Sequence, residues 1–287
     1  MRSISLRSPA KLNLFLKVIN KRPDGYHNLE TLFERIDLCD DIQLKLNTDG
    51  AIRVFCDHPD VPTDSQNLVY RAAELLRDDF ALANGVDIKI TKRIPVAAGL
   101  GGGSSNAATT LLGLSQLWKL DLTRKELLAC AGKIGSDVSF FLYDCSWALG
   151  TGRGECIKKL NLTTQLWHTL VVPPIKLTSR DVFGTLQHMN VLTKPNDDVN
   201  IFTRSLRKND FSAINGFLRN DLERAILKLC PNLSQLKEKF HGLNPGAVLF
   251  SGSGPALFSL TRTQKEAEDL KSILKEDYTQ VFAVRTF

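Results

Sequence analysis

The chain has 287 residues, of which 43% are hydrophobic and 24% are charged, a balance typical of a globular protein with one large or two moderate domains. Lysine and arginine total 37 against 31 acidic residues, and the formal charge of +6 suits an anionic ligand. The basic residues are spread out without an arginine-rich tract, and no apolar run approaches about 18 residues, so neither a nucleic-acid-binding nor a membrane-spanning protein is expected.

The six cysteines are expected to be reduced and mostly buried, in a cytoplasmic protein. None forms a C-x-x-C pair, and the five histidines stand at no zinc-like spacing. The N-terminal stretch MRSISLRSPAKLNLFL has the basic start and the apolar content of a signal peptide. Its apolar residues alternate with polar ones, however, and no small-residue cleavage site follows, so a strand is the better interpretation.

Apolar and polar residues alternate in much of the first third of the chain, a period typical of strands. Asn67 precedes an amphipathic segment, LVYRAAELLRDDF, which is expected to form a helix. A turn-rich loop, KRPDGYHNLE, follows the second predicted strand. The predicted strands cover 2–8, 11–19, 30–38, 42–47, 51–56 and 86–94.

Two further helices are predicted in the middle of the chain. NAATTLLGLSQLWKL (106–120) has the apolar density of a buried helix. Thr123 and Glu126 have the spacing of a capping box, which predicts a helix over 124–133. A short segment, DVSFFLYD, and a turn, GTGRGE (150–155), precede the strand-like ECIKKL.

The pattern changes from about residue 170. Residues 191–210 are polar and weakly patterned, and two or three helices are expected over 210–240. The apolar runs AVLF and ALFSL flank SGSGP, and a helix near 264–276 precedes a last strand, TQVFAVRTF. Strands followed by helices, twice over, predict an α+β protein of two lobes, which we place at 1–160 and 161–287.

The stretch PVAAGLGGGSSNAA (95–108) has enough glycine for the backbone to approach a ligand closely. No lysine follows the glycines, which excludes a Walker A loop, and GLGGGS lacks the last glycine of a Rossmann fingerprint. What remains is a turn that leads into a helix. Its amides from Leu100 to Ser105 can form an anion nest, beside the hydroxyls of Ser104 and Ser105. The alternative is a flexible loop that only starts a helix.

Three smaller features each have a functional and a structural interpretation. Lys11 and Asn13 project from one face of a predicted strand, about 7 Å apart. They could hold an anionic oxygen and orient a hydroxyl, or they could lie on a solvated edge. Asp137 either caps a helix or accepts a hydroxyl proton. The turn in LFSGSGPALFSL (249–260) is either a tight hairpin or a second backbone surface against a ligand.

PAKLNLFL, PVAAGLGGGSSNAA and FSGSGPALF stand in this order along the chain, and together they strongly resemble the motifs of the GHMP kinase superfamily. The resemblance implies a two-lobed fold, with an N-terminal ribosomal-protein-S5-like lobe that carries the ATP loop and a C-terminal ferredoxin-like lobe that closes the substrate cleft. PDGYHNLETLF, IGSDVSFFL and GTGRGE are similar to one branch of the superfamily. That branch uses ATP to phosphorylate the 2-hydroxyl of a cytidine diphosphate-linked methylerythritol in non-mevalonate isoprenoid biosynthesis.

The resemblance also implies roles for individual residues. Lys11 and Asp137 would be the catalytic pair, with Asp137 taking the proton from the hydroxyl. Tyr26 and Phe183 would stack on the cytosine, and His27 would hydrogen-bond to it. The further substrate-binding residues implied are Asn13, Phe33 and Ser179. The ATP-binding residues implied are Asn67, Pro95, Val96, Ala97, Ala98, Gly99, Leu100, Gly101, Gly102, Gly103, Ser104, Ser105 and Asn106.

The family pattern implies ATP as co-substrate and Mg²⁺ as cofactor. Because no dedicated magnesium carboxylate is evident, we expect the phosphates and water to hold most of the ion, and its protein ligands stay unknown. This chain departs from the pattern at Ser139, where a proline is usual, and at Thr178 and Ser179, which stand in reversed order. We expect a monomer or weak homodimer, without nucleic-acid or membrane partners.

Three other functions remain open from the sequence. A different GHMP kinase, for homoserine or mevalonate, is disfavoured by the PDGYHNLETLF loop. A non-catalytic regulator that binds sugar and nucleotide would tend to lose Lys11 and Asp137, which are both present. RNA binding is suggested by the isoelectric point near 9.0, but no arginine-rich or aromatic motif supports it.

Overall fold

The computed structural model describes residues 2–187, 189, 198–243 and 246–287. Residue contacts divide the chain into two compact units. The chain passes from one unit to the other within two strands, twice in the glycine-rich loop and once after Asp144. The lobes 1–160 and 161–287 stay a prediction. Unit 1 comprises Met1–Ala10, Leu38–Val96 and Gly101–Asp144, and unit 2 comprises Lys11–Asp37, Ala97–Leu100 and Cys145–Phe287.

Two long strands, β1 (Ser3–Lys21) and β2 (His27–Asn47), each contribute to both units. The sequence predicts a break in each strand, and both predictions are wrong. In β1, every residue from Ser8 to Val18 is buried, so packing keeps the chain extended across the expected break. In β2, Asp40 resembles a turn residue, but its carboxylate is paired with the Lys92 ammonium inside unit 1.

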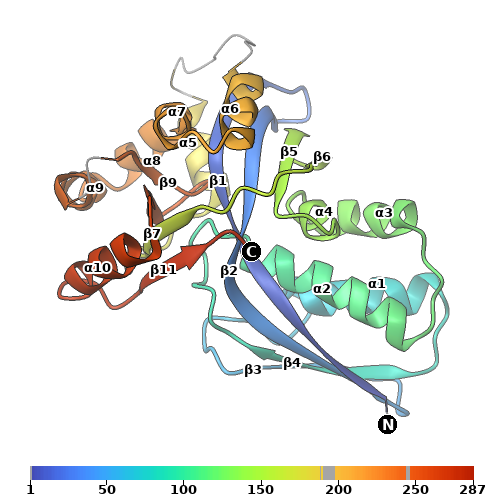
Figure 1. The fold of residues 1–287 in the computed structure, drawn as a ribbon. Coiled ribbons are helices and arrows are strands. Elements are labelled where there is room, and N and C mark those ends of the chain that lie inside the picture. Colours follow the sequence, from blue (N-terminus) through green and yellow to red (C-terminus); the bar gives the residue numbers. More distant parts are fainter. Residues whose placement is uncertain (1, 188, 190–197, 244–245) are drawn as a thin grey trace. The chain divides into compact units, whose positions relative to one another are not determined.

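Unit 1 combines a sheet with helices that pack on it. The second half of β2 pairs antiparallel with β4, and β3 pairs parallel with β4. Helices α1 and α2 pack against each other and lie over the sheet (Figure 1). The elements are β3 (Ile52–Cys56), α1 (Leu68–Asp79), β4 (Gly85–Thr91), α2 (Gly102–Leu117), α3 (Arg124–Ile134) and α4 (Val138–Phe141).

The predicted N-termini of α1 and α3 are confirmed. The Asn67 side chain accepts a hydrogen bond from Val69 N–H at 2.9 Å, and Thr123 with Glu126 forms the reciprocal capping box. Helix α2 instead begins four residues before the predicted start. Gly101, with a φ of +70°, turns the chain so that the helix follows directly.

Strand β4 ends three residues before the predicted end. The next three backbone N–H groups leave the ladder and donate to carboxylates: Lys92 N–H to Asp57 Oδ1, and Arg93 N–H and Ile94 N–H to Asp40 Oδ1. Because these side chains replace the ladder partners, the chain bends there toward the glycine-rich loop.

Among the described residues of unit 2, four antiparallel strands form a sheet in the order β11-β7-β10-β9. Helices lie between β7 and β9 and between β10 and β11 in the sequence, which is the ferredoxin-like succession that the resemblance implies. The strands are β7 (Trp167–Val171), β9 (Val248–Phe250), β10 (Leu257–Thr261) and β11 (Val281–Arg285).

Further strands of unit 2 pair with β1 and β2. Strand β5 pairs antiparallel with the first half of β2 and with β6, and β8 pairs parallel with β1 at Phe15 and Leu16. The apolar faces of α5, α8, α9 and α10 share a core with β1. These elements are β5 (Trp147–Gly152), β6 (Cys156–Leu160), β8 (Arg219–Asn220), α5 (Ser179–Leu186), α6 (Asp198–Arg207), α7 (Phe211–Phe217), α8 (Glu223–Leu229), α9 (Leu233–Leu243) and α10 (Gln264–Leu274).

The C-terminal predictions are confirmed as α7, α8, α9, β9, β10, α10 and β11. The sequence does not predict β5, β7, α5 or α6. Helix α6 buries Val199, Phe202 and Leu206, which have the i, i+3, i+7 spacing of a helical face. Polar residues that precede this helix dilute the pattern over 191–210, which is why the segment is misjudged.

The last residues of the chain are hydrogen-bonded to β2 within unit 2. Thr286 Oγ1 donates to the Glu34 carboxyl at 2.5 Å and accepts from Leu166 N–H at 2.8 Å. The other Glu34 oxygen lies 2.8 Å from His168 Nε2, and the Glu34 and His168 side chains are fully buried. This cluster joins β2, β7 and the C-terminus.

Thr286→Val is expected to lower the free energy of unfolding by about 1–3 kcal/mol, because a buried carboxyl oxygen and a backbone N–H lose their partner while the side-chain shape is kept. Urea denaturation measures the loss. Arg285→Ala is the control, since its ion pair with Asp37 is largely exposed and contributes less than about 1 kcal/mol. An equal loss in the two variants would contradict the role of the buried cluster.

No helix within the described part of the chain is long and apolar enough to cross a membrane. The six cysteines are all free thiols. Cys39, Cys130 and Cys145 are buried, whereas Cys156 is exposed.

Candidate active site

Three segments that lie far apart in the sequence meet in unit 2. They are the part of β1 that begins at Lys11, the loop residues Ala97–Leu100, and the turn between β9 and β10. Each one carries one of the three motifs singled out in the sequence. Hydrogen bonds join them: Lys11 N–H to Leu100 C=O (3.0 Å), Ala256 N–H to Ala98 C=O (3.2 Å) and Ser251 Oγ–H to Gly99 C=O (3.1 Å).

Two glycines make this approach possible. Gly99 has a φ of +80°, and a Cβ built on it would lie 2.1 Å from the Ser251 carbonyl oxygen. Gly252 has a φ of +54°, and its Cβ would lie 3.0 Å from Asn13 Oδ1 and 3.2 Å from Lys11 Nζ. The turn after β9 is therefore more than a hairpin, because its backbone lies directly against the Lys11–Asn13 pair.

The Lys11–Asn13 pair is buried, so the alternative of a solvated strand edge is wrong. Lys11 Nζ donates to Asn13 Oδ1 at 2.5 Å, and Asn13 Nδ2 donates to Thr31 Oγ1 at 2.8 Å. Thr31 Oγ1 in turn donates to the Phe15 carbonyl at 2.8 Å. Phe33 is buried, with its ring centroid 5.5 Å from the Lys11 ammonium. This chain of hydrogen bonds fixes the direction of a cationic side chain that is only 4% exposed.

Asn220 is a supporting residue that the sequence does not reveal. Its Nδ2 donates to the carbonyls of Phe250 (2.8 Å) and Gly252 (2.7 Å), and its Oδ1 accepts from Leu222 N–H (2.9 Å). The two bonds from Nδ2 hold the turn that lies against Lys11, and the bond to Leu222 N–H fixes the orientation of the Asn220 amide. Asn220 lies in a segment where the family motifs are weak, so no sequence signal marks it.

The residues expected at the cytosine lie close together in unit 2. The rings of His27 and Phe183 are stacked, with centroids 5.4 Å apart and an interplanar angle of 24°. Burial, together with the nearby charge of Lys21, holds the pKa of His27 below its ordinary value, so the ring is neutral at pH 7. The Tyr26 ring is 57% exposed and lies against the Arg153 guanidinium, at 4.9 Å from its centroid.

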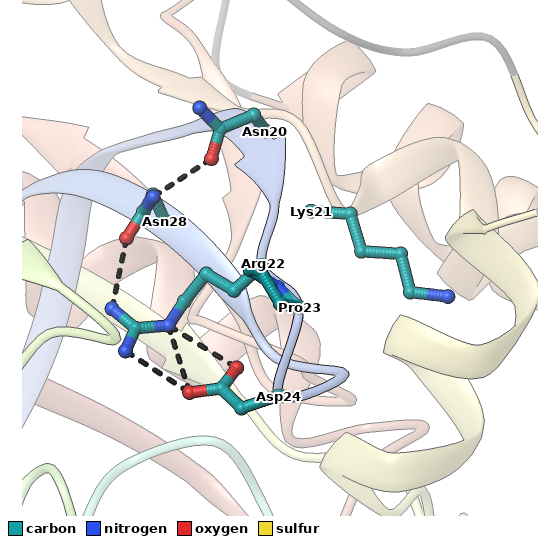
Figure 2. A pocket seen from close by; sticks show the side chains of 6 residues that line it. All are labelled: Asn20, Lys21, Arg22, Pro23, Asp24 and Asn28. Atoms are coloured by element: carbon teal, nitrogen blue, oxygen red, sulfur yellow. Dashed lines mark hydrogen bonds and ion pairs between the residues drawn. The ribbon is translucent and has the colours of Figure 1, made fainter.

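The turn that carries Tyr26 is held by its own side chains. Arg22 Nε donates to both oxygens of Asp24, and Arg22 Nη1 donates to Asn28 Oδ1 at 3.1 Å. Asn28 Nδ2 then donates to Asn20 Oδ1 at 2.7 Å (Figure 2). The hydrogen bonds that Arg22 donates to its carboxylate, and to a smaller extent the charge of Arg22, lower the pKa of Asp24. These residues, with Lys21 and Pro23, line an open pocket beside the turn (Figure 2).

Ser179, expected at the substrate, begins α5 and lies next to the glycine turn of unit 2. Its Oγ is 2.9 Å from Ser253 Oγ. Thr178, which stands in reversed order relative to the family pattern, caps α5 by accepting from Asp181 N–H at 3.1 Å. Thr178 therefore has a capping role, and the Ser179 hydroxyl is directed at the turn.

In unit 1, the start of α2 is tied to β1. Ser8 Oγ donates to Ser105 Oγ at 2.8 Å and lies 2.7 Å from Asn106 Oδ1, and the Ser105 hydroxyl is fully buried. These contacts anchor the loop where it enters the helix, so the loop is not a flexible segment at that point. Ser8 directly precedes the PAKLNLFL motif, but no pattern in the sequence singles it out.

A buried ion pair supports the same end of α2. Lys92 Nζ lies 2.7 Å from Asp40 Oδ2 and donates to the Ile94 carbonyl at 2.5 Å. A Cβ built on Gly102 would lie 3.0 Å from Ile94 Cγ2 and 3.1 Å from Lys92 Nζ, so a larger residue there would press on both side chains. Burial lowers the pKa of Lys92, and Asp40 partly offsets that effect. No pattern in the sequence indicates that Lys92 and Asp40 form a pair.

Asp137 and Asn67, the remaining predicted residues, also lie in unit 1. Asp137 stands at the N-cap position of α4 and is half-buried, but its side chain makes no capping hydrogen bond, so the structural alternative of a cap is wrong. Ser139, in place of the usual proline, is buried within α4. Asn67 uses its Oδ1 as the α1 cap and donates from Nδ2 to the Pro62 carbonyl at 2.6 Å, so its predicted contact with ATP stays a prediction.

Family models for two domains match the chain. The model for the GHMP kinases N terminal domain covers residues 67–145, and the model for the GHMP kinases C terminal domain covers residues 202–280. The first includes the glycine-rich loop, all of α2 and Asp137, and the second includes the turn between β9 and β10. These matches and the converging motifs define a GHMP kinase fold.

Curated and solved relatives narrow the class. A protein of Geobacillus kaustophilus named 4-diphosphocytidyl-2-C-methyl-D-erythritol kinase is 43% identical, covering 98% of this chain and 96% of its own length. A crystal structure of a 4-(cytidine 5'-diphospho)-2C-methyl-D-erythritol kinase matches with a TM-score of 0.83 and 31% identity, covering 98% of each chain. The chain belongs to the 4-diphosphocytidyl-2-C-methyl-D-erythritol kinase family of GHMP kinases. A homoserine kinase of Cytophaga hutchinsonii, at 21% identity, TM-score 0.74 and coverage of 100% and 95%, shares the fold alone.

Proposed function

We propose that this chain transfers the γ-phosphoryl group of ATP to the 2-hydroxyl of 4-diphosphocytidyl-2-C-methyl-D-erythritol. The products are the 2-phosphate and ADP, in the non-mevalonate route to isoprenoid precursors. The observation that carries the proposal is the convergence of three family motifs on the buried Lys11–Asn13 pair in unit 2. Identity of 43% over nearly the whole chain to a kinase of that name supports the choice of substrate.

In the proposed reaction, the oxygen of the substrate 2-hydroxyl attacks the γ-phosphorus while Asp137 accepts the hydroxyl proton. The bond from the γ-phosphorus to the β–γ bridging oxygen breaks, and ADP leaves with that electron pair. Phosphoryl transfer needs positioning and charge stabilisation more than covalent chemistry from the protein. Lys11 supplies a fixed positive charge for the reacting oxygens, and the amides at the start of α2 bind phosphate oxygens.

We propose that magnesium arrives with ATP rather than in a site that the protein builds. Within the described residues, no group of three or more histidine, cysteine, aspartate or glutamate side chains could hold a metal ion. Magnesium commonly keeps several waters and binds through substrate phosphates, so such a cage is not needed. When bound, the ion would neutralise charge on the phosphates.

At the other end of the substrate, Tyr26, His27 and Phe183 would recognise cytosine. A neutral histidine both donates and accepts a hydrogen bond, which suits the mixed donor and acceptor edge of that base. The lowered pKa keeps His27 in this form at neutral pH. Glu30 in β2 interacts electrostatically with Lys17 in β1, but the proposed chemistry uses neither residue.

Substrate affinity is expected to be constant from about pH 7 to 8 and to weaken only as the pH falls below the ordinary histidine pKa of 6.5. Because burial, together with the charge of Lys21, lowers the pKa of His27 in the folded protein, the neutral ring that binds the base persists at neutral pH and is lost when acid protonates it. Calorimetric titration with the substrate measures this, since a diphosphate esterified at both ends does not titrate in that range. His27→Gln should bind the substrate more weakly, and its affinity should no longer fall at acid pH. The exposed His241→Gln should keep the wild-type fall in affinity at acid pH. If the affinity of His27→Gln still falls at acid pH, the role of His27 at the base is refuted.

We further propose a cytoplasmic enzyme that is a monomer or weak homodimer and has no nucleic-acid or membrane partner. The absence of a membrane-spanning helix in the described residues and the scattered basic charge are in keeping with this.

The deciding experiment measures ADP release by the purified protein with Mg-ATP and one of four alcohols: 4-diphosphocytidyl-2-C-methyl-D-erythritol, homoserine, mevalonate or galactose. Turnover with the cytidyl substrate alone is the expected result. Turnover with another alcohol would keep the kinase chemistry but reject the roles of Tyr26 and His27. ATP binding without ADP release from any substrate would favour a nucleotide-binding regulator.

A further inference from the structure

Arg153 lies at the turn between β5 and β6 and has no part in the proposed mechanism. Its guanidinium carbon is 4.9 Å from the centroid of the Tyr26 ring, which is a cation–π geometry. The Glu155 carboxylate contacts Arg153 twice: Oε2 accepts from the Arg153 backbone N–H at 2.5 Å, and Oε1 lies 3.5 Å from Nε of the guanidinium. The backbone hydrogen bond fixes the start of the side chain, and the ion pair with Nε holds the cation over the ring.

The backbone of Tyr26 is already fixed without Arg153. Tyr26 N–H donates to Asp24 Oδ1 at 3.1 Å, and the Tyr26 carbonyl accepts from Arg22 N–H at 2.7 Å. These contacts set the position of the Cα atom but leave the side-chain torsions undetermined. Since the ring is 57% exposed, a contact on the ring itself is needed to hold its orientation.

The two arginines near Tyr26 are each paired with a carboxylate. Arg22 is paired with Asp24 at 3.0 Å, and Arg153 with Glu155. An arginine that is already paired with a carboxylate binds a diphosphate more weakly than an unpaired arginine does, because the carboxylate repels the incoming anion. Its planar guanidinium can still stack on an aromatic face. The geometry thus favours contact with the ring over contact with substrate phosphates.

We propose that Arg153 is a positioning residue for substrate recognition. It occupies one face of the Tyr26 ring and holds the ring so that the opposite face can stack on the pyrimidine base. This inference rests on the proposed function, because it takes Tyr26 as a surface for cytosine. A ring held in advance loses less conformational freedom when the base binds, which raises affinity without a new contact to the ligand.

Arg153→Ala is expected to weaken the binding of cytidine, CMP and CDP by the same factor, about two- to fivefold, as removal of an exposed cation–π contact predicts. The KM for 4-diphosphocytidyl-2-C-methyl-D-erythritol should rise by that factor, with kcat and the KM for ATP unchanged. Arg153→Lys should restore part of the affinity. A loss that grows from cytidine to CMP to CDP would instead indicate direct phosphate contact and overturn the proposal.

A double-mutant cycle tests whether Arg153 acts through the ring. In a Tyr26→Leu background, Arg153→Ala should have no further effect on CDP affinity, whereas in Tyr26→Phe it should keep its full effect. An undiminished effect in the Leu background would overturn the proposal.

Arg262→Ala is the matched control, since Arg262 makes the same type of contact with Phe211, at 4.3 Å, and has no proposed role. It should leave all the ligand affinities unchanged. A wild-type protein that binds neither CDP nor the cytidyl substrate would refute the proposed function and this inference together. Wild-type binding that Arg153→Ala leaves unaltered would refute this inference alone.

Discussion

Asp137→Asn is expected to lower kcat by about 10²- to 10⁴-fold, the range typical of losing a general base. The amide has nearly the shape of the carboxylate, so α4 should form as before, but it cannot accept the hydroxyl proton. Because the side chain of Asp137 does not cap α4, the loss cannot be attributed to a lost cap. The Kd for ATP should stay within about twofold, since the proposed mechanism assigns the phosphates to backbone amides of the loop and not to Asp137.

Single-turnover ADP formation and nucleotide titration measure the two quantities separately. Asp121→Asn, an exposed carboxylate of unit 1, is the control and should keep wild-type turnover. Lys11→Ala should lower kcat far less in the Asp137→Asn background than in the wild type. The effects of two substitutions are not additive when the residues act together in one step. Turnover of Asp137→Asn within threefold of wild type, on the order of experimental scatter, would reject the base assignment.

Gly99→Ala is expected to lower the free energy of unfolding by about 2–5 kcal/mol and to raise the KM for ATP more than about tenfold. The φ of +80° is unfavourable for alanine, and the added Cβ would lie 2.1 Å from the Ser251 carbonyl oxygen, 3.0 Å from Gly254 N and 3.1 Å from the Gly254 carbonyl oxygen. These three neighbouring atoms all belong to the backbone, so no side chain can move aside. The loop must then leave the turn, and the hydrogen bond from Ser251 Oγ to the Gly99 carbonyl is lost with it.

Thermal unfolding and ATP kinetics together test this prediction. Gly132→Ala is the matched control, because Gly132 lies inside α3 with nothing within 4 Å of an added Cβ. That variant should unfold at the same or a slightly higher temperature, since alanine is favoured in helices by up to about 1 kcal/mol. If Gly99→Ala keeps both the melting temperature and the KM for ATP of the wild type, the loop does not depend on its contact with the turn.

Local sequence patterns were sufficient to predict the helix N-termini that depend on neighbouring residues alone. The caps at Asn67 and Thr123 are confirmed because a capping side chain bonds to backbone only two or three residues away. The prediction fails where tertiary contacts override local pattern. Asp40 looks like a turn residue, yet β2 continues through it because Lys92, 52 positions away, pairs with its carboxylate.

The same distinction applies to the candidate site. The sequence by itself determined the family motifs, the glycines that a close backbone approach requires, and the α+β class, because each is encoded within a few neighbouring residues. Only the tertiary structure decided what those residues touch: Ser8 reaches Ser105 across 97 positions, and Ser251 reaches Gly99 across 152. Arg153 and Asn220 acquire their contacts in the same way. Such pairs are set by strand register and by the packing of the cores, which no local pattern of residues specifies.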